Sequence, residues 1–263
     1  MASFTSQILT MTIQKQSSKY DWKIKGIRRN IENVIKQLGT LYWEMKFEVK
    51  EEGINCTTVD GTHVAVMKLF WPNDSFEYYE IIKESTFTVN NVNDIIHAMK
   101  TAGLNDIVSL QFNGTQLQIN TDNQEIILPN QKEAPVTRTP KLDATENIEP
   151  PVNWFKEAIA GCGRKSDLAR FSHENEKFVI EAVIDGYVGD KEVWKYSTDI
   201  VPTTQEEKIC SYDLRYLKRL SSLMKTAKVD NFVINFKTNY PLKMKWELQD
   251  GAKIDFFLAP RVD

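Results

Sequence analysis

The sequence predicts an α+β fold built from two copies of one helix–strand unit. The first observation is a repeated block, because Met99-Lys100-Thr101-Ala102 returns as Met224-Lys225-Thr226-Ala227. The second is its context: apolar residues with helical spacing precede each copy, and a strand-like segment follows it, at 107–112 and 232–236. Four identical residues in the same context indicate an internal duplication. The third is a proline-rich stretch between the two copies, which is typical of a connector.

The first half of the chain is expected to hold two helices, each followed by strands. Apolar residues at Ile27, Ile31, Val34, Ile35 and Leu38 recur with helical spacing, which predicts a helix over residues 27–38. A second helix is expected over residues 92–101. Alternation of apolar and polar residues predicts strands over residues 45–49, 54–58, 63–70, 87–89, 107–112, 117–119 and 125–128.

The second half repeats this order after a linker. Residues 129–151 carry five prolines among charged residues, so an extended interdomain connector is expected there. Helices are then predicted over 152–162 and 212–226, and strands over 169–172, 178–183, 193–198, 232–236, 243–248 and 253–258. The last two strands form a hairpin around Asp250-Gly251. The expected domains are therefore 20–128 and 152–263, with residues 1–19 as a flexible extension.

Composition limits the cell compartment and the kind of site. The three cysteines, Cys56, Cys162 and Cys210, are an odd number with wide spacing, so we expect buried thiols in a reducing compartment and no zinc site. Residues 1–19 lack the basic start and apolar core of a signal peptide. No apolar run reaches membrane-spanning length.

The charges are distributed unevenly between helices and strands. The net charge of −3 does not by itself indicate binding to nucleic acid. Counted with the residues at their ends, over 28–39, 91–102, 152–165 and 212–226, the four expected helices carry eleven lysines and arginines against four acids, a net of +7, which leaves the rest of the chain at −10. Amphipathic helices often carry lysine and arginine on their wet face for solubility alone. The alternative is that the four helices share one surface that faces phosphate.

Two other classes of protein fit the sequence less well than one with a helix-lined, phosphate-facing surface. The segment 161–166, GCGRKS, has neither the spacing nor the preceding strand of a phosphate-binding loop, and no Ser/His/Asp set or metal-spaced cluster appears, so an enzyme is not expected. A β-rich single-strand-binding protein would need exposed aromatic residues on its strands. The tryptophans and phenylalanines here mostly occupy alternating, core-like positions.

Four segments resemble a known family. Residues 54–80 read INCTTVDGTHVAVMKLFWPNDSFEYYE, with an apolar strand, an acidic turn, a His-Val pair and a second strand. Near the end stand Tyr240-Pro241-Leu242-Lys243 and the run FFLAPRV over 256–262. These motifs, with Leu214-Arg215-Tyr216-Leu217, resemble the sliding clamps of the PCNA family over the chain from about Tyr20 to its end. The ending is most similar to that of archaeal members. Glu32 and Asn33 depart from the family, which often has two lysines there.

The resemblance implies a non-enzymatic, intracellular processivity factor that acts at the chromosome or nucleoid. Three chains, identical or related, would form a ring of six domains around double-stranded DNA, with helices lining the hole and no cofactor. The expected contacts to phosphate are electrostatic and independent of base sequence. They come from Arg28, Arg29, Lys36, His97, Lys100, Lys156, Arg164, Lys165, Arg215, Lys218, Arg219 and Lys225.

The resemblance also implies a partner pocket and two subunit edges. The pocket would bind peptides of the type Q-x-x-[ILM]-x-x-F-F from a DNA polymerase, flap nuclease, ligase or clamp loader. Its expected residues are Val59, His63, Val64, Val66, Val136, Pro241, Phe257, Ala259, Pro260 and Arg261. Subunits would join through two strand edges, which contain Glu125, Ile126, Ile127, Leu128, Val193, Trp194 and Tyr196.

Overall fold

The computed structural model describes residues 19–39, 41, 44–131, 147–174, 176–185, 191–200 and 208–261. Within these ranges, no helix is long and apolar enough to span a membrane. The helices are α1 (Arg28–Leu38), the 3₁₀ helix η1 (Asn73–Ser75), α2 (Asn93–Ala98), α3 (Val152–Cys162) and α4 (Leu214–Thr226).

The strands of the first domain are β1 (Trp22–Ile27), β2 (Met45–Lys50), β3 (Gly53–Val59), β4 (Ala65–Pro72), β5 (Tyr78–Ile81), β6 (Ser85–Val89), β7 (Ile107–Phe112), β8 (Gln116–Thr121) and β9 (Gln124–Pro129). Those of the second domain are β10 (Leu168–Glu174), β11 (Lys177–Asp185), β12 (Lys191–Asp199), β13 (Ile209–Asp213), β14 (Phe232–Asn235), β15 (Leu242–Glu247) and β16 (Lys253–Leu258).

The element order confirms the duplication. Helix α1 and strands β2, β3 and β4 correspond to α3, β10, β11 and β12. Strand β6 and helix α2 correspond to β13 and α4, and β7, β8 and β9 correspond to β14, β15 and β16. Strand β1 pairs with β7, and the isolated bridge of Ile148 with Ile234 of β14 is its counterpart in the second domain.

The described strands form three sheets, and one of them joins the domains. Their strand orders are β5-β1-β7-β8-β9, β12-β11-β10-β13 and β14-β15-β16-β4-β3-β2-β6. In the third sheet, β16 of the second domain pairs antiparallel with β4 of the first, with Phe256 opposite Met67. The two domains therefore share a continuous hydrogen-bonded sheet.

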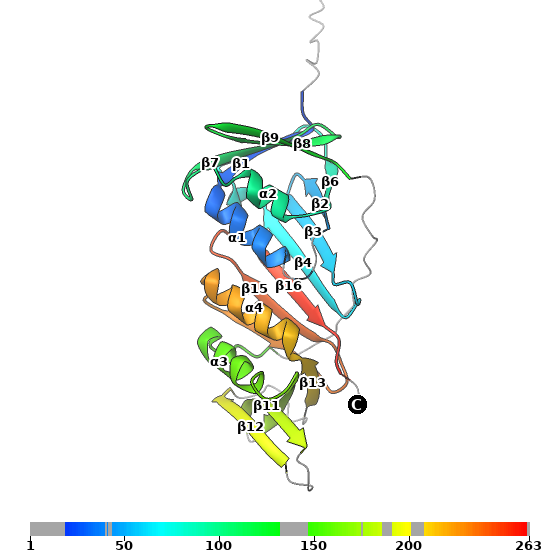
Figure 1. Ribbon diagram of the computed structural model, residues 1–263, viewed down its shortest axis with the longest axis vertical. Coiled ribbons are helices and arrows are strands. Elements are labelled where there is room, and N and C mark those ends of the chain that lie inside the picture. The colour runs from blue at the N-terminus through cyan, green and yellow to red at the C-terminus, as the bar shows by residue number, and fades with distance from the viewer. Residues whose placement is uncertain are drawn as a thin grey trace, which may run out of the picture.

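The four α-helices lie on the same side of the sheets. Figure 1 shows them in a row along the long axis of the molecule, in front of the strands. Helices α1 and α4 contact each other where the domains meet. Their apolar faces, which include Ile31 and Val34 of α1 and Leu217 and Leu220 of α4, are buried in one cluster that runs through both domains. Each such side chain contributes roughly 1.5–3 kcal/mol by leaving water.

Several boundaries differ from the sequence predictions. Helix α2 ends at Ala98, so the first copy of the repeated block lies in the turns after it, whereas the second copy ends α4. Strand β4 begins at Ala65 because His63 lies in a turn with φ 59°. Residues 209–213 form β13, and the backbone amide of Arg215 donates to Asp213, which caps α4. Strands β1 and β5 were not expected from the sequence.

The expected connector lies mostly outside the described residues, and Val136 with it. Two described stretches border it. Strand β9 ends at Pro129, and Ile148 forms an isolated antiparallel bridge with Ile234 of β14 before α3 begins at Val152.

Candidate nucleic-acid interface, partner surface and subunit edges

The twelve residues expected to contact DNA all lie on the helices or in the turns directly after them. Nine are exposed: Arg29, Lys36, His97, Lys100, Arg164, Lys165, Arg215, Arg219 and Lys225. Arg28, Lys156 and Lys218 are half-buried. Because the four helices share one side of the sheets, these cations come from both domains to one surface, which we call the helix face.

An acid in α1 neutralises part of the helix face. The carboxylate of Glu32 lies 3.3 Å from Arg28 and 2.6 Å from Lys36, one helical turn away on each side. Burial raises the pKa of Glu32, but hydrogen bonds and charge from Lys36 and Arg28 outweigh it, so the pKa lies below its ordinary value. Arg28 and Lys36 therefore share a counter-ion within their own helix.

Three other cations of the helix face also have protein partners. Lys165 lies 3.0 Å from Glu192 and above the ring of Trp194. The ammonium group of Lys218 donates to the carbonyl oxygen of Gly163 at 2.7 Å, which ties α4 to the end of α3. Arg215 pairs with Asp213 at 2.6 Å.

The remaining lysines and arginines of the helix face form no ion pair within the described residues. Within the part of the chain that the structure describes, no acid lies within salt-bridge distance of Arg29, Lys100, Lys156, Arg164, Arg219 and Lys225. These six side chains are distributed over both domains. They can attract phosphate without first breaking an internal pair.

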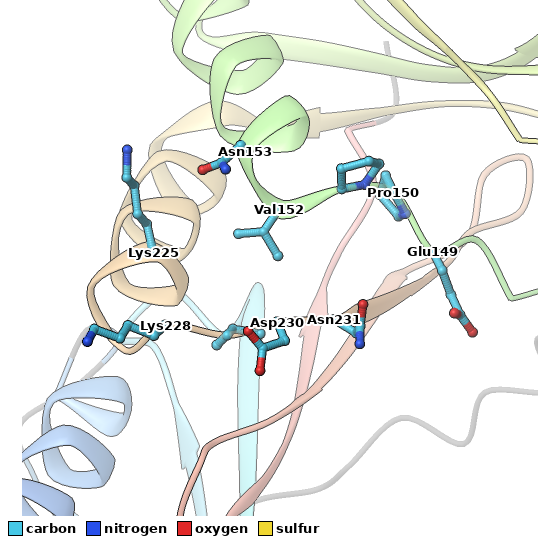
Figure 2. A pocket seen from close by; sticks show the side chains of 10 residues that line it. Glu149, Pro150, Val152, Asn153, Lys225, Lys228, Asp230 and Asn231 are labelled. Atoms are coloured by element: carbon cyan, nitrogen blue, oxygen red, sulfur yellow. The ribbon is translucent and has the colours of Figure 1, made fainter.

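A hollow of about 480 Å³ opens where α3 begins and α4 ends. Figure 2 shows Lys225 and Lys228 on one side of it, with Asp230 and Asn231 below the start of α3. In the first domain the start of α1 and the turn after α2 are bridged at the corresponding place, because the guanidinium group of Arg28 donates to the carbonyl oxygen of Ala102. The hollow therefore lies beside Lys225, one of the cations of the helix face.

Some of the residues expected to bind partners come together on the outer face of the shared sheet. Val59 lies opposite Val66, and Val66 opposite Phe257, so the three form a row across β3, β4 and β16. The next residue in the row, Lys243, places its ammonium group 5.1 Å from the ring centre of Phe257. Phe257 is 4% exposed although its side of the sheet is opposite to the main core.

The turn between β3 and β4 and the end of the chain border this row. The amide of Ala259 donates to the carbonyl oxygen of Val64 at 2.8 Å, so the segment after β16 runs beside the turn. Arg261 is exposed and donates to Asp213 at 3.1 Å. Pro241 precedes β15 and Pro260 follows β16, and both are half-buried. We call the row, the turn and these segments the partner surface.

Asp60 shapes the turn that carries His63 and Val64. Its Oδ1 accepts from the amides of Val64 and Ala65 at 2.8 and 2.7 Å, and its Oδ2 accepts from the hydroxyl of Tyr216 at 2.6 Å. Burial raises the pKa of Asp60, but hydrogen bonds from Thr62, Tyr216 and nearby amides outweigh it and hold the pKa below its ordinary value.

The residues expected at subunit edges lie on strands that, among the described residues, have one unpaired side. Strand β9 is the last of its sheet and β12 the first of its own. Ile126, Leu128, Trp194 and Tyr196 pack against the main core. Glu125, Ile127 and Val193 point the other way and are exposed. Two open β edges of this length are unusual in a protein that acts as a monomer.

A family model described as "Proliferating cell nuclear antigen, N-terminal domain" matches residues 10–142, which is just over half of the chain. The chain belongs to the proliferating cell nuclear antigen family. The match begins inside residues 1–19, which the sequence motifs left outside the resemblance.

Curated relatives of this family extend the match to most of the chain. The "DNA polymerase sliding clamp" of Archaeoglobus fulgidus is 27% identical over 240 residues, which cover 89% of this chain and 95% of the relative. That of Methanococcus maripaludis is 26% identical over 259 residues, covering 89% and 96%. Similarity to both over nearly their full lengths identifies the chain as a clamp-type member of the family.

Solved structures of the family share the fold. The structure titled "C-terminal region of FEN-1 bound to A. fulgidus PCNA" superimposes with a TM-score of 0.77 at 25% identity, covering 92% of this chain and all but 1% of that chain. The clamp of Thermococcus kodakaraensis gives 0.76 at 22% identity, covering 91% of this chain and 100% of the other, which supports the fold alone.

Two functional features of this family member were missed from the sequence. The ion pairs of Glu32 could have been found, because Arg28, Glu32 and Lys36 stand four residues apart, a spacing that brings side chains together on a helix. The contact between Asp60 and Tyr216 had no such signal, because 156 residues separate them.

Proposed function

We propose that this chain is a DNA polymerase sliding clamp, which forms a ring around duplex DNA and tethers replication and repair proteins to it. The observation that carries the proposal is the combination of one cationic helix face with two open strand edges in a chain of this family. A monomeric single-strand-binding protein would need neither the unpaired edges nor cations confined to helices.

The helix face suits a protein that must move along DNA. Six cations, Arg29, Lys100, Lys156, Arg164, Arg219 and Lys225, have no ion-pair partner among the described residues, and they are separated along both domains. Separated lysines and arginines attract phosphate without reading bases. The ring would then hold DNA by its closed shape, and the cations would keep the duplex centred.

The edges of β9 and β12 suit ring closure. Each chain offers one edge of each kind, on different domains. Pairing of β9 in one chain with β12 in the next is a head-to-tail contact, which closes into a ring when the rotation per chain divides a full turn. Three chains of two domains each would give the six-domain ring.

The partner surface suits a peptide with an apolar end. Val66 and Phe257 form the middle of the row, and the exposed Val64 lies at its border. A peptide Q-x-x-[ILM]-x-x-F-F from a polymerase, nuclease, ligase or clamp loader would place its apolar side chains there. Burial of two or three such side chains, at roughly 1.5–3 kcal/mol each, would supply about 3–9 kcal/mol, a large part of the roughly 8 kcal/mol of micromolar binding.

Charge reversal on the helix face tests the function. We expect Lys100→Glu with Arg219→Glu to abolish most of the stimulation of polymerase on a primed circle while the native mass of the assembly stays the same. Each lost phosphate contact should lower the salt slope of DNA binding by about one. The matched control is Lys245→Glu with Lys253→Glu, which reverses two exposed lysines on β15 and β16. Equal losses in both double variants, or binding that depends on base sequence and survives high salt, would contradict the proposal.

A further inference from the structure

One buried carboxylate lies between the helix face and the partner surface. Asp213 is the last residue of β13 and caps α4, and its side chain is only 6% exposed. Two arginines pair with it, and both are largely exposed, Arg215 at 67% and Arg261 at 53%. Arg215 belongs to the helix face and Arg261 to the partner surface. Asp213 is therefore a counter-ion that the two surfaces share.

The two oxygens of Asp213 have different partners. Oδ1 accepts from the backbone amide of Arg215 at 2.9 Å, which caps the helix, and Nε of the same arginine lies 3.1 and 3.2 Å from the two oxygens. Oδ2 accepts from Nη2 of Arg215 at 2.6 Å and from Nη2 of Arg261 at 3.1 Å. Two guanidinium groups thus donate to one oxygen, and their like charges repel each other.

Arg261 helps to fix the segment that follows β16. Its amide donates to the carbonyl oxygen of Ser211 in β13 at 2.8 Å, and its guanidinium group donates to Asp213. Two residues earlier, the amide of Ala259 donates to the carbonyl oxygen of Val64. The segment after β16 is thus held between the turn of β3 and β4 and the start of α4. The ion pair with Asp213 is one of the contacts that order this border of the partner surface.

The duplication does not account for this arrangement. When the two repeated blocks are aligned, Thr88 and Asn90 take the places of Asp213 and Arg215. Neither of these residues carries a charge, and no side chain caps α2. The shared carboxylate is therefore particular to the second domain.

DNA inside the ring would change the balance at this carboxylate. Arg215 can reach a phosphate only by leaving Asp213, in contrast to the unpaired cations of the helix face. Because this arginine is largely exposed, its ion pair is weak enough to be exchanged for a charge-assisted bond to phosphate. Among the described residues, Arg261 is then the cation left to the buried carboxylate. Since an uncompensated buried charge is costly, that remaining pair becomes stronger.

We infer that Asp213 is a positioning residue that couples DNA inside the ring to peptide on the partner surface. Phosphate that takes Arg215 leaves the carboxylate to Arg261, which holds the segment after β16 in place. A border that is already ordered loses less conformational entropy when the peptide binds, so the clamp on DNA binds peptide more tightly than the free clamp. This inference rests on the proposed clamp function and adds to it a dependence of partner binding on DNA.

Peptide affinity with and without DNA measures the coupling. A fluorescein-labelled Q-x-x-[ILM]-x-x-F-F peptide is titrated into the free clamp and into clamp loaded on nicked circular DNA, and fluorescence anisotropy gives both dissociation constants. We expect the loaded clamp to bind the peptide about three- to fivefold more tightly, because exposed ion pairs contribute little each. By linkage, the peptide raises the affinity of the ring for DNA by the same factor.

Asp213→Asn separates the ion pairs from the helix cap. Its amide oxygen can still accept from the backbone of Arg215, and asparagine caps helices as well as aspartate does. Its NH₂ group cannot accept from either guanidinium group. We expect this variant to bind peptide equally with and without DNA. Arg261→Gln leaves the cap untouched and should abolish the dependence on DNA in the same way, so a folding defect in Asp213→Asn does not decide the outcome.

Arg215→Gln should imitate the DNA-bound state. It leaves Asp213 to Arg261 in the free clamp, so peptide affinity without DNA should rise about three- to fivefold, and loading on DNA should add nothing further. Arg219→Gln is the matched control, because it removes the same charge from the same helix and forms no ion pair among the described residues. An equal rise in both variants would assign the effect to net charge and overturn the inference.

The same measurements distinguish the coupling from the clamp function. A chain that does not stay on circular DNA, or that binds no peptide, contradicts the proposed function and the coupling with it. Retention on DNA with a peptide affinity that DNA does not change overturns the coupling and leaves the clamp function standing. A DNA dependence that persists in both Asp213→Asn and Arg261→Gln overturns the role of Asp213.

Discussion

The hydroxyl group of Tyr216 donates a 2.6 Å hydrogen bond to Oδ2 of Asp60. Tyr216 belongs to α4, on the helix face of the second domain, and Asp60 belongs to the turn that borders the partner surface in the first domain. Asp60 also accepts from the amides of Val64 and Ala65, so one carboxylate holds the turn and links it to α4. The two surfaces with proposed functions are thus joined by a direct polar contact.

Removal of this hydroxyl should destabilise the chain and disturb the partner surface together. We expect Tyr216→Phe to lower the free energy of unfolding by about 1–2 kcal/mol, because a hydrogen bond to a charged group is lost at a half-buried site. Urea unfolding followed by circular dichroism measures the change. Tyr79→Phe is the control, because that hydroxyl donates to the carbonyl oxygen of Lys50 within the first domain. A Tyr216→Phe variant with unchanged stability and peptide affinity would show that the contact is incidental.

Acid should weaken the fold through two carboxylates. The pKa values of Asp60 and Asp213 lie below the ordinary value of 3.8, because hydrogen bonds from neighbours outweigh the opposing effect of burial. A carboxyl group whose pKa is lower in the folded state stabilises that state above its unfolded pKa and loses this contribution as the pH falls through the folded value. We therefore expect the free energy of unfolding to fall as the pH decreases below about 4.

Asparagine at these positions isolates the effect. Asp60→Asn should be less stable than the unmodified chain at pH 7, and its stability should depend less on pH between 5 and 3. Chemical unfolding at each pH measures both quantities. A pH dependence as steep as that of the unmodified chain would assign the acid sensitivity to other groups.

Glu32 should lower the affinity of the ring for DNA. Its side chain is 13% exposed and pairs with Arg28 and Lys36 on α1. Glu32→Gln releases both cations, so we expect tighter binding to duplex DNA and a salt slope steeper by up to about two. The control is Glu48→Gln, which removes an acid that lies between Lys46 and Lys50 on β2, away from the helix face. If the two variants raise DNA affinity equally, the increase comes from the change in net charge and not from the release of Arg28 and Lys36.

The partner surface should lose affinity for peptides when a charge is introduced at its border. Val64 is 37% exposed, so Val64→Asp should leave the fold and the assembly intact. We expect affinity for a Q-x-x-[ILM]-x-x-F-F peptide, measured by calorimetry, to fall by at least tenfold, because an apolar anchor site is lost. Ile82→Asp, at a more exposed apolar residue in the first domain, is the control.

A charge at Val136 tests in the same way whether the connector contributes to peptide binding. Val136→Asp should remain a ring and lose peptide binding if the connector forms one wall of the site, although that residue lies outside the described part of the chain. Unchanged peptide affinity in both Val64→Asp and Val136→Asp would place the peptide elsewhere on the molecule.

Local patterns predicted the helices well and the long-range contacts poorly. The spacing of Ile31, Val34 and Leu38 predicted α1 because one face of a helix must be buried. Strand β1 was missed although Trp22 and Ile24 alternate with lysines, since its pairing with β5 and β7 is set by residues far along the chain. The two edge strands were expected in the right places.

In the candidate site, too, local features could be predicted from the sequence and contacts between distant elements could not. Cations on a helix can be read from the sequence, but whether each is free depends on its neighbours. Spacing alone would have paired Glu32 with Arg28 and Lys36. The contact of Lys218 with the carbonyl oxygen of Gly163 depends on how α3 packs against α4, and no local pattern in the chain encodes it.

Topological retention on DNA is the most direct test of the central claim. The chain is loaded onto nicked circular DNA with ATP and the clamp loader of the same cell, and free protein is removed at high salt by gel filtration. We expect the protein to stay with the circle and to be released when one restriction cut makes the DNA linear, because a closed ring slides off a free end. Retention on the linear DNA equal to that on the circle, or failure to stay on the circle at all, would contradict a sliding clamp.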